Sequence, residues 1–137
     1  MNRIDFQEIA ELRLRESKTL LDAGFPDGAY YLAGYAVECA LKACIAKRTR
    51  EHDFPEKKLV NDSHTHDLEK LLTVAELKGE LDAAVQADPM MEESRTTVQE
   101  WSETSRYEKK TVREATRLLK AIEDREGGLL PWIMQRW

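Results

Sequence analysis

Apolar residues recur every three to four positions along the chain, which is the spacing of amphipathic helices. No segment shows the strict alternation of apolar and polar residues that is typical of a strand. The pattern predicts long helices over residues 4–23, 27–50, 66–78 and from 111 to the glycine pair at 127–128, and shorter helices over 80–87 and 129–137. It therefore predicts an all-α fold, an up-and-down bundle of four to five helices, with residues 1–137 forming one domain.

Glycine, proline and capping residues divide these segments. Gly24 and Pro26 end the first helix, and Thr111 with Glu114 forms a capping box at the start of the last long helix. Residues 51–63 are polar and predict a loop. Residues 90–107 stay ambiguous. One further turn of helix is compatible with two features there. Thr97-x-x-Glu100 could start it, and Val98 with Trp101 could anchor it.

The segment 27–50 is apolar on most sides, which indicates a helix in the middle of the bundle. Gly34 interrupts it. A glycine in a helix interior costs about 1 kcal/mol relative to alanine, so this position predicts a close backbone approach by a neighbouring element.

Composition limits the classes of protein that fit. Hydrophobic residues make up 42% and charged residues 34% of the chain, which disfavours both a disordered and a membrane protein. There is no apolar run of about 20 residues and no signal-peptide core near the start, so a cytoplasmic location is expected. Cys39 and Cys44 point about 140° apart on one helix, which predicts two buried free thiols rather than a disulfide.

The first candidate site is a polar stripe on the central helix. Tyr31, Tyr35, Glu38 and Lys42 share one helix face, and Glu38 stands four residues before Lys42, the favourable order for an ion pair. Two interpretations stay open. The stripe is either a satisfied ion pair at a core edge or dimer seam, or the floor of a polar cleft between protomers, with tyrosines available to stack on a base.

The histidines are the second candidate. His64 and His66 lie two residues apart, which suits neither one helix face nor a usual zinc spacing, and His52 precedes Asp53 in the polar segment. We therefore predict no metal and no cofactor. Residues 65–67 are instead expected to organise the start of the third helix through capping and the helix dipole.

The third candidate is a row of basic residues in the last third of the chain. Five positions fall within about 80° of arc on a continuous helix. They are Arg106, Lys110, Arg113, Arg117 and Lys120. Such a row can follow a phosphate backbone, although Arg106 joins it only if the helix begins before the capping box. The alternative is a solvated face balanced by nearby glutamates, and the net charge of −5 disfavours a generally basic nucleic-acid binder.

Three segments together resemble HEPN (higher eukaryotes and prokaryotes nucleotide-binding) domains. Residues 36–43 match an A-x-E-x-x-L-K-A helix, residues 65–68 read T-H-D-L, and residues 105–107 read S-R-Y. The resemblance covers nearly the whole chain with the segments in register. It implies a helical bundle that pairs as a homodimer and acts on RNA or nucleotides. Many HEPN proteins belong to toxin–antitoxin or defence modules and are encoded beside a minimal nucleotidyltransferase.

The ribonucleases of this family carry an arginine followed four to six residues later by a histidine at the dimer cleft. Arg106 matches the arginine, but no histidine follows His66 in this chain. Arginine supplies positive charge and cannot act as the base. The sequence therefore predicts a binding or accessory module, with Glu38, Lys42, Arg106 and Tyr107 at the cleft. Tyr31 and Tyr35 would stack on a base, and Arg113 and Arg117 would reach phosphate.

Two rival functions remain open. One is a metal-independent ribonuclease in which Tyr107, Glu103 or Glu38 replaces the missing histidine. The other is a structural partner of a nucleotidyltransferase whose cleft is only a dimer seam, with Tyr35 or Val37 at that seam.

Overall fold

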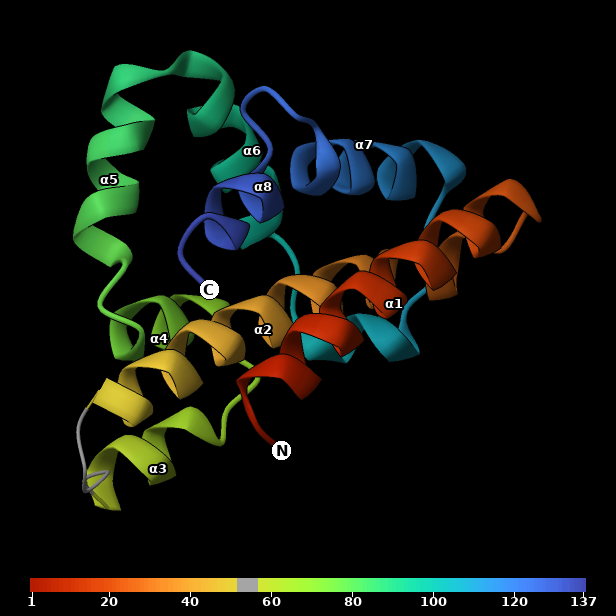
Figure 1. Ribbon diagram of the computed structural model, residues 1–137. Helices are drawn as coiled ribbons and strands as arrows, with labels where there is room; N and C mark the ends of the chain where they lie inside the picture. The colour runs from red at the N-terminus through yellow and green to blue at the C-terminus, as the bar shows by residue number, and fades with distance from the viewer. Residues whose placement is uncertain (52–56) are drawn as a thin grey trace.

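A computed structural model describes residues 1–51 and 57–137 of the protein (Figure 1). All regular secondary structure in these residues is helical. The helices are α1 (Arg3–Asp22), α2 (Pro26–Glu51), α3 (Lys57–Ser63), α4 (Leu68–Val74), α5 (Lys78–Ala87), α6 (Pro89–Gln99), the 3₁₀-helix η1 (Glu103–Tyr107), α7 (Val112–Glu123) and α8 (Leu129–Met134). The predicted fold class is confirmed. The described residues form eight α-helices rather than four to five, because parts of the expected loop and of the ambiguous segment are also helical.

The central helix of the bundle is α2. Figure 1 shows α1 and α2 side by side in opposite directions, with α5 to α8 gathered over one side of this hairpin. Helix α2 contacts α1, α4, η1, α7 and α8. Its side chains at Ala33, Val37 and Leu41 are completely buried. Contact on several sides explains why its sequence is apolar around most of its circumference.

Gly34 is needed because the indole of Trp101 packs directly on it. A Cβ atom at position 34 would lie 2.1 Å from Cε2 of Trp101. The predicted close approach is therefore present, but a side chain makes it and not a neighbouring backbone. Trp101 is only 5% exposed and follows the end of α6. Its packing fixes the chain that leads into η1 against the middle of α2.

Helix α4 is shorter than the predicted helix over residues 66–78. The carboxylate of Asp67 accepts the backbone N–H groups of Glu69 and Lys70 at 3.0 and 3.2 Å, so the helix begins after Asp67. At its other end, Glu76 adopts a left-handed conformation with a φ of 59°. The backbone N–H of Leu77 then donates to the carbonyl of Leu72 at 3.0 Å, closing the helix as a Schellman motif does.

The remaining helix starts follow local capping. The predicted capping box at Thr111 and Glu114 is present, with the N–H of Glu114 donating to Thr111 Oγ1 at 3.0 Å. Asp88 caps α6, where Pro89 occupies the first turn. Thr97 therefore lies in the last turn of α6 and does not start a helix, so that interpretation of the ambiguous segment is wrong.

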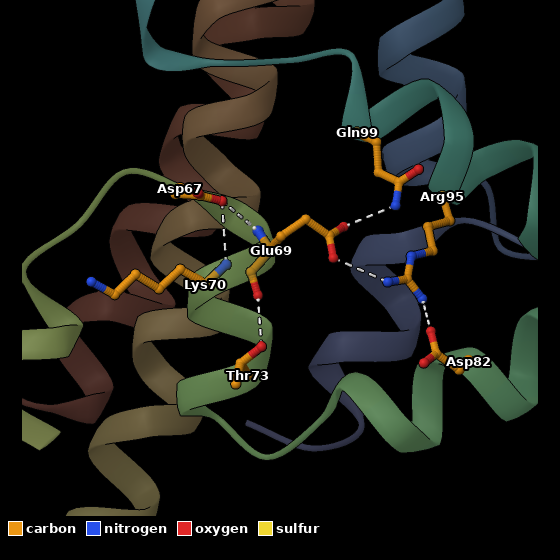
Figure 2. Close-up of polar contacts among 7 residues, drawn as sticks. All are labelled: Asp67, Glu69, Lys70, Thr73, Asp82, Arg95 and Gln99. Carbon is orange, nitrogen blue, oxygen red and sulfur yellow. Dashed lines mark hydrogen bonds and ion pairs between the residues drawn. The ribbon is translucent and has the colours of Figure 1, made fainter.

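A buried arginine joins α4, α5 and α6 (Figure 2). Arg95 of α6 pairs with Glu69 Oε2 of α4 at 3.1 Å and with Asp82 of α5. Gln99, one helical turn further along α6, donates to Glu69 Oε1 at 3.1 Å. Figure 2 shows Arg95 and Gln99 reaching from α6 toward the same carboxylate. This network holds the start of α4 against α6 and so fixes the position of the residues immediately before α4.

None of the helices among the described residues has the length and apolar character that crossing a membrane requires. Cys39 and Cys44 are buried and unpaired with each other, as predicted from their spacing. Both lie on α2 within the bundle core.

The Gly34–Trp101 contact generates a stability prediction. Gly34→Ala should lower the free energy of unfolding by about 2 kcal/mol or more, because the new methyl group overlaps the indole and overpacking of a rigid site is costly. Gly79→Ala on α5 is the matched control, since a methyl group at that position would have no heavy atom within 4 Å. Urea denaturation should show that the control is neutral or up to about 1 kcal/mol more stable. Equal effects at the two sites would contradict the packing described.

Candidate functional site

A buried carboxylate on α2, that of Glu38, is the centre of the candidate site. Glu38 is 1% exposed, and its Oε1 accepts a hydrogen bond from Nζ of Lys42 at 3.1 Å. The same oxygen lies 2.7 Å from Nδ1 of His66. Burying a carboxylate is costly unless it is paired, and these two contacts compensate Oε1, while Oε2 is buried without a hydrogen-bond partner among the described residues. The ion pair predicted between Glu38 and Lys42 is thus present.

His66 extends this arrangement to η1. Its Nε2 lies 3.1 Å from Oε2 of Glu103, so each ring nitrogen faces a carboxylate oxygen. The His66 side chain is 52% exposed and that of Glu103 is 35% exposed, in contrast to Glu38. We refer to Glu38, Lys42, His66 and Glu103 as the acid–histidine cluster. It has a buried end at Glu38 and a solvent-facing end at Glu103.

The expected role of residues 65–67 is only partly right. Asp67 caps α4, and the hydroxyl of Thr65 accepts the N–H of Asp67 at 3.2 Å. The His66 side chain does not cap the helix, because both of its nitrogens face Glu38 and Glu103. Sequence reasoning missed this role of His66. The available signal was its position within the T-H-D-L segment that resembles the family.

Arg106 belongs to η1 and follows Glu103 of the cluster by three residues. Residues three apart lie on the same side of a 3₁₀-helix, so Glu103 and Arg106 share one face of η1. The guanidinium of Arg106 is exposed and lies 4.8 Å from the centre of the Tyr107 ring, a side chain that is 80% exposed. Interaction with Tyr107 raises the pKa of Arg106, and Glu103 and Tyr31 act in the same direction. Glu38 lies at the buried end of the cluster, where its Oε1 faces Nδ1 of His66.

Aromatic rings extend from the cluster along α2. The ring of Tyr31 stacks between Tyr35, with centroids 6.0 Å apart, and Trp101, with centroids 6.2 Å apart. Burial raises the pKa of the Tyr35 hydroxyl, with Cys39 and Glu38 acting in the same direction. The three rings tie the α2 stripe to the segment that leads into η1.

A groove of about 640 Å³ borders the cluster on the side of α1. Its walls include Phe6, Ile9 and Arg13 of α1 and the stripe residues Tyr35, Glu38 and Lys42 of α2. This volume is within the range of small-molecule and cofactor sites. The walls combine apolar and charged side chains, and Arg13 is paired with Glu16 at 2.8 Å. Three of the four stripe residues thus line one hollow, and Tyr31 continues the stack behind Tyr35.

The predicted row of five basic residues is wrong as one helical face. Helix α7 begins at Val112, so Arg106 and Lys110 precede it. Lys110 lies 4.4 Å above the Tyr30 ring and 3.1 Å from Glu108, and its side chain is only 16% exposed. Through these contacts, Lys110 packs the segment before α7 against α2.

The other basic residues of the row are on α7. Arg113, Arg117 and Lys120 are exposed there. Arg117 pairs with Glu100, the C-cap residue of α6, at 3.5 Å. This pairing fits the interpretation of the row as a solvated, charge-balanced face.

Val37 and the histidines were also singled out in the sequence. Val37 is completely buried in the core, so a change there acts on the packing of the bundle rather than on an exposed seam. His52 and Asp53 fall outside the described residues. Among the residues that are described, no group of three or more histidine, cysteine, aspartate or glutamate side chains is arranged to hold a metal ion.

Comparison with known proteins gives one match. The family model described as HEPN domain matches residues 5–125, which include every residue of the acid–histidine cluster. No curated protein and no solved structure matches the chain at a significant level.

The burial of Glu38 generates a prediction for Lys42. Lys42→Met should destabilise the protein by about 2 kcal/mol, because it removes one of two partners from a carboxylate that stays buried. In a Glu38→Gln background the same change should cost less, with a coupling energy of about 1 kcal/mol. The control is Lys58→Met, since Lys58 pairs with Asp62 at the same spacing with its side chain 84% exposed. It should change stability by less than about 0.5 kcal/mol. A double-mutant cycle by urea denaturation without coupling would contradict the pairing.

The two thiols generate a reactivity prediction. Burial raises the pKa of Cys39 to about 11, with Glu38 adding to the effect, and burial likewise raises that of Cys44 to about 11. An exposed thiol has a pKa of about 8.5, so at pH 8 the folded protein should react with Ellman's reagent about 100-fold more slowly than the protein in urea. Reactivity of the folded protein should rise with pH toward 11. Rapid labelling of either thiol at pH 8 under native conditions would show that it is not buried in this way.

Proposed function

Because the chain belongs to the HEPN domain family, we propose that it is a homodimeric accessory module that binds RNA or a nucleotide. Family membership links it to nucleotide- or RNA-directed function. The observation that carries the proposal is the meeting of two motif segments with η1 at one place. Residues 36–43 and 65–68 come from distant parts of the chain and supply Glu38, Lys42 and His66 to the acid–histidine cluster, and Glu103, two residues before the S-R-Y segment, completes it.

The surface around the cluster has the chemistry that a ribonucleotide needs. Arg106 and Tyr107 form an exposed cation–aromatic pair, in which the ring offers a stacking face and the guanidinium offers charge to a phosphate. Tyr35 provides an aromatic wall in the groove, and Lys42 provides a cation beside it. With a net charge of −5, the protein depends on such local groups rather than on a general positive field.

The proposed homodimer would bring two clusters together. A twofold axis passing near the groove would place both copies of Tyr35 and of the η1 surface at one interface. This arrangement agrees with the preference of the family for dimers. A minimal nucleotidyltransferase is the proposed protein partner, and the accessory role assigned here is to present the bound RNA or nucleotide within that module.

Binding is tested with fluorescently labelled single-stranded RNA and labelled ATP by anisotropy at low salt. The full chain should bind at least one of them, and binding should weaken as salt increases. Arg106→Ala should weaken RNA binding severalfold and lower the slope of log affinity against log salt by about 0.7, the value for one lost phosphate contact on a single strand. The control is Lys78→Ala, which removes an exposed lysine at the start of α5.

Three results would count against this proposal. Absence of binding to RNA and to ATP at low salt would remove the binding function and leave a purely structural role. Sedimentation of the protein as a monomer across its accessible concentration range would remove the homodimer. An equal loss of affinity in Lys78→Ala and Arg106→Ala would show that binding does not use the surface of η1.

A further inference from the structure

The groove beside α1 has an apolar part that the proposed function does not use. Phe6 and Ile9 of α1 and Ile45 and Ala46 of α2 line this part. Ile45 follows Tyr35, the groove residue proposed to face a base, by ten residues, which is about 15 Å along a helix. The whole groove has a volume of about 640 Å³. Sites of this size with mostly apolar walls and a few polar groups are typical of small-molecule ligands.

Two arginines of α1 stand on either side of this apolar wall. Arg3, Phe6, Ile9 and Arg13 follow one another at spacings of three or four residues, so they share one face of α1, and all four line the groove. Arg3 and Arg13 are ten residues apart, which again is about 15 Å along the helix. Phe6 and Ile9 thus lie between two guanidinium groups.

The two arginines differ in their partners. Arg13 forms an ion pair with Glu16 at 2.8 Å. Arg3 donates through a terminal nitrogen to the carbonyl oxygen of Trp137, and it forms no ion pair with a side chain in the part of the chain that the structure describes. Its Nε is buried without a hydrogen-bond acceptor among the same residues. The guanidinium of Arg3 therefore keeps an unused donor at its end of the groove.

The charges of the groove favour an anionic head group over a cationic one. Among the described residues that line the groove, Glu38 is the one carboxylate, and Lys42 and His66 already compensate its charge. A cation that entered the groove would therefore meet Arg3 and Arg13 without an uncompensated carboxylate to bind. A carboxylate would meet a guanidinium, whose planar N–H groups match its two oxygens.

We propose that the groove binds a medium-chain fatty acid, with its carboxylate on Arg3 and its chain between α1 and α2. The chain would pack on Phe6, Ile9 and Ile45, which need an apolar partner to be removed from water. With carbon–carbon bonds of about 1.5 Å, an extended chain of about ten carbon atoms is comparable in length to the apolar wall. This inference goes beyond the proposed function and does not depend on it, because it uses neither η1 nor the acid–histidine cluster.

The test titrates the full chain, labelled at its isoleucine methyl groups, with decanoate below the concentration at which decanoate forms micelles. The NMR signals of Ile9 and Ile45 should shift along one saturating curve, whereas that of Ile122, which is buried on α7, should stay in place. Decanol and decylammonium, which carry the same chain, should bind at least severalfold more weakly. Octanoate should also bind more weakly, by up to about fourfold for each methylene removed.

Two pairs of variants test the two ends of the ligand. Arg3→Gln should weaken decanoate binding severalfold and change decanol binding little, and its control is Arg15→Gln, an exposed position of α1 outside this groove. Phe6→Glu should abolish decanoate binding, because it places a carboxylate in the apolar wall. Its control is Phe25→Glu, since Phe25 is 61% exposed and lies outside this groove. Both controls should bind as the unaltered protein does, and circular dichroism confirms that each variant is folded.

The outcomes separate this inference from the proposed function. Unshifted signals of Ile9 and Ile45, or equal affinities for decanoate, decanol and decylammonium, overturn it. Shifts on dilution of the protein without any on addition of decanoate assign the groove to a second copy of the chain, and displacement of decanoate by ATP assigns it to a nucleotide. Both results also overturn the inference. Arg106→Ala should bind decanoate as the unaltered protein does, so a failure to bind RNA would leave the inference intact.

Discussion

The arrangement of the candidate site depends on the cost of enclosing the carboxylate of Glu38 in a bundle of helices. A charge in that position is stable only when other groups compensate it, and here Lys42 and His66 do so. Lys42 comes from the next turn of the same helix, but His66 comes from a segment 28 residues later. The requirement to pair one buried carboxylate thus links the local geometry of α2 to the placement of α4 and, through His66, to η1.

Two other contacts hold the partners in place around Glu38. The indole of Trp101 packs on Gly34, one helical turn before Glu38, and this contact places the chain entering η1 against α2. Arg95 joins α4 to α5 and α6 and so fixes the residue before the Asp67 cap. Neither contact includes a residue of the acid–histidine cluster. Together they determine where His66 and Glu103 meet, which makes the geometry of the site a property of the whole fold.

Much of this fold follows from local sequence signals. The α1–α2 hairpin, the apolar central helix and the capping box at Thr111 were predictable, because helical periodicity and capping act within a few residues. The helices of residues 57–107 were predicted less accurately, because local signals define their ends less clearly. There the helices are short, and the end of α4 depends on Glu76, which reads in sequence as an ordinary polar residue. The Schellman closure at Glu76 in particular uses a residue that rarely adopts a positive φ.

The site was predictable only in part, because its contacts connect distant segments. Spacing along one helix was sufficient to predict the pair of Glu38 and Lys42. It gave no information on the contact of His66 with both Glu38 and Glu103, which arises only when three elements pack together. The prediction of one basic row was wrong because it assumed a continuous helix through residues 106–110. These residues precede α7, and Lys110 packs on the ring of Tyr30.

The central claim, that a buried Glu38 orients His66, is tested most directly by long-range proton–nitrogen NMR of the histidine rings. We expect Nδ1 of His66 to carry a proton in a strong hydrogen bond, seen as a slowly exchanging, strongly downfield resonance. This resonance should disappear in Glu38→Gln. A His66 ring that resembles a freely exchanging histidine, with the same spectrum in both proteins, would contradict the claim.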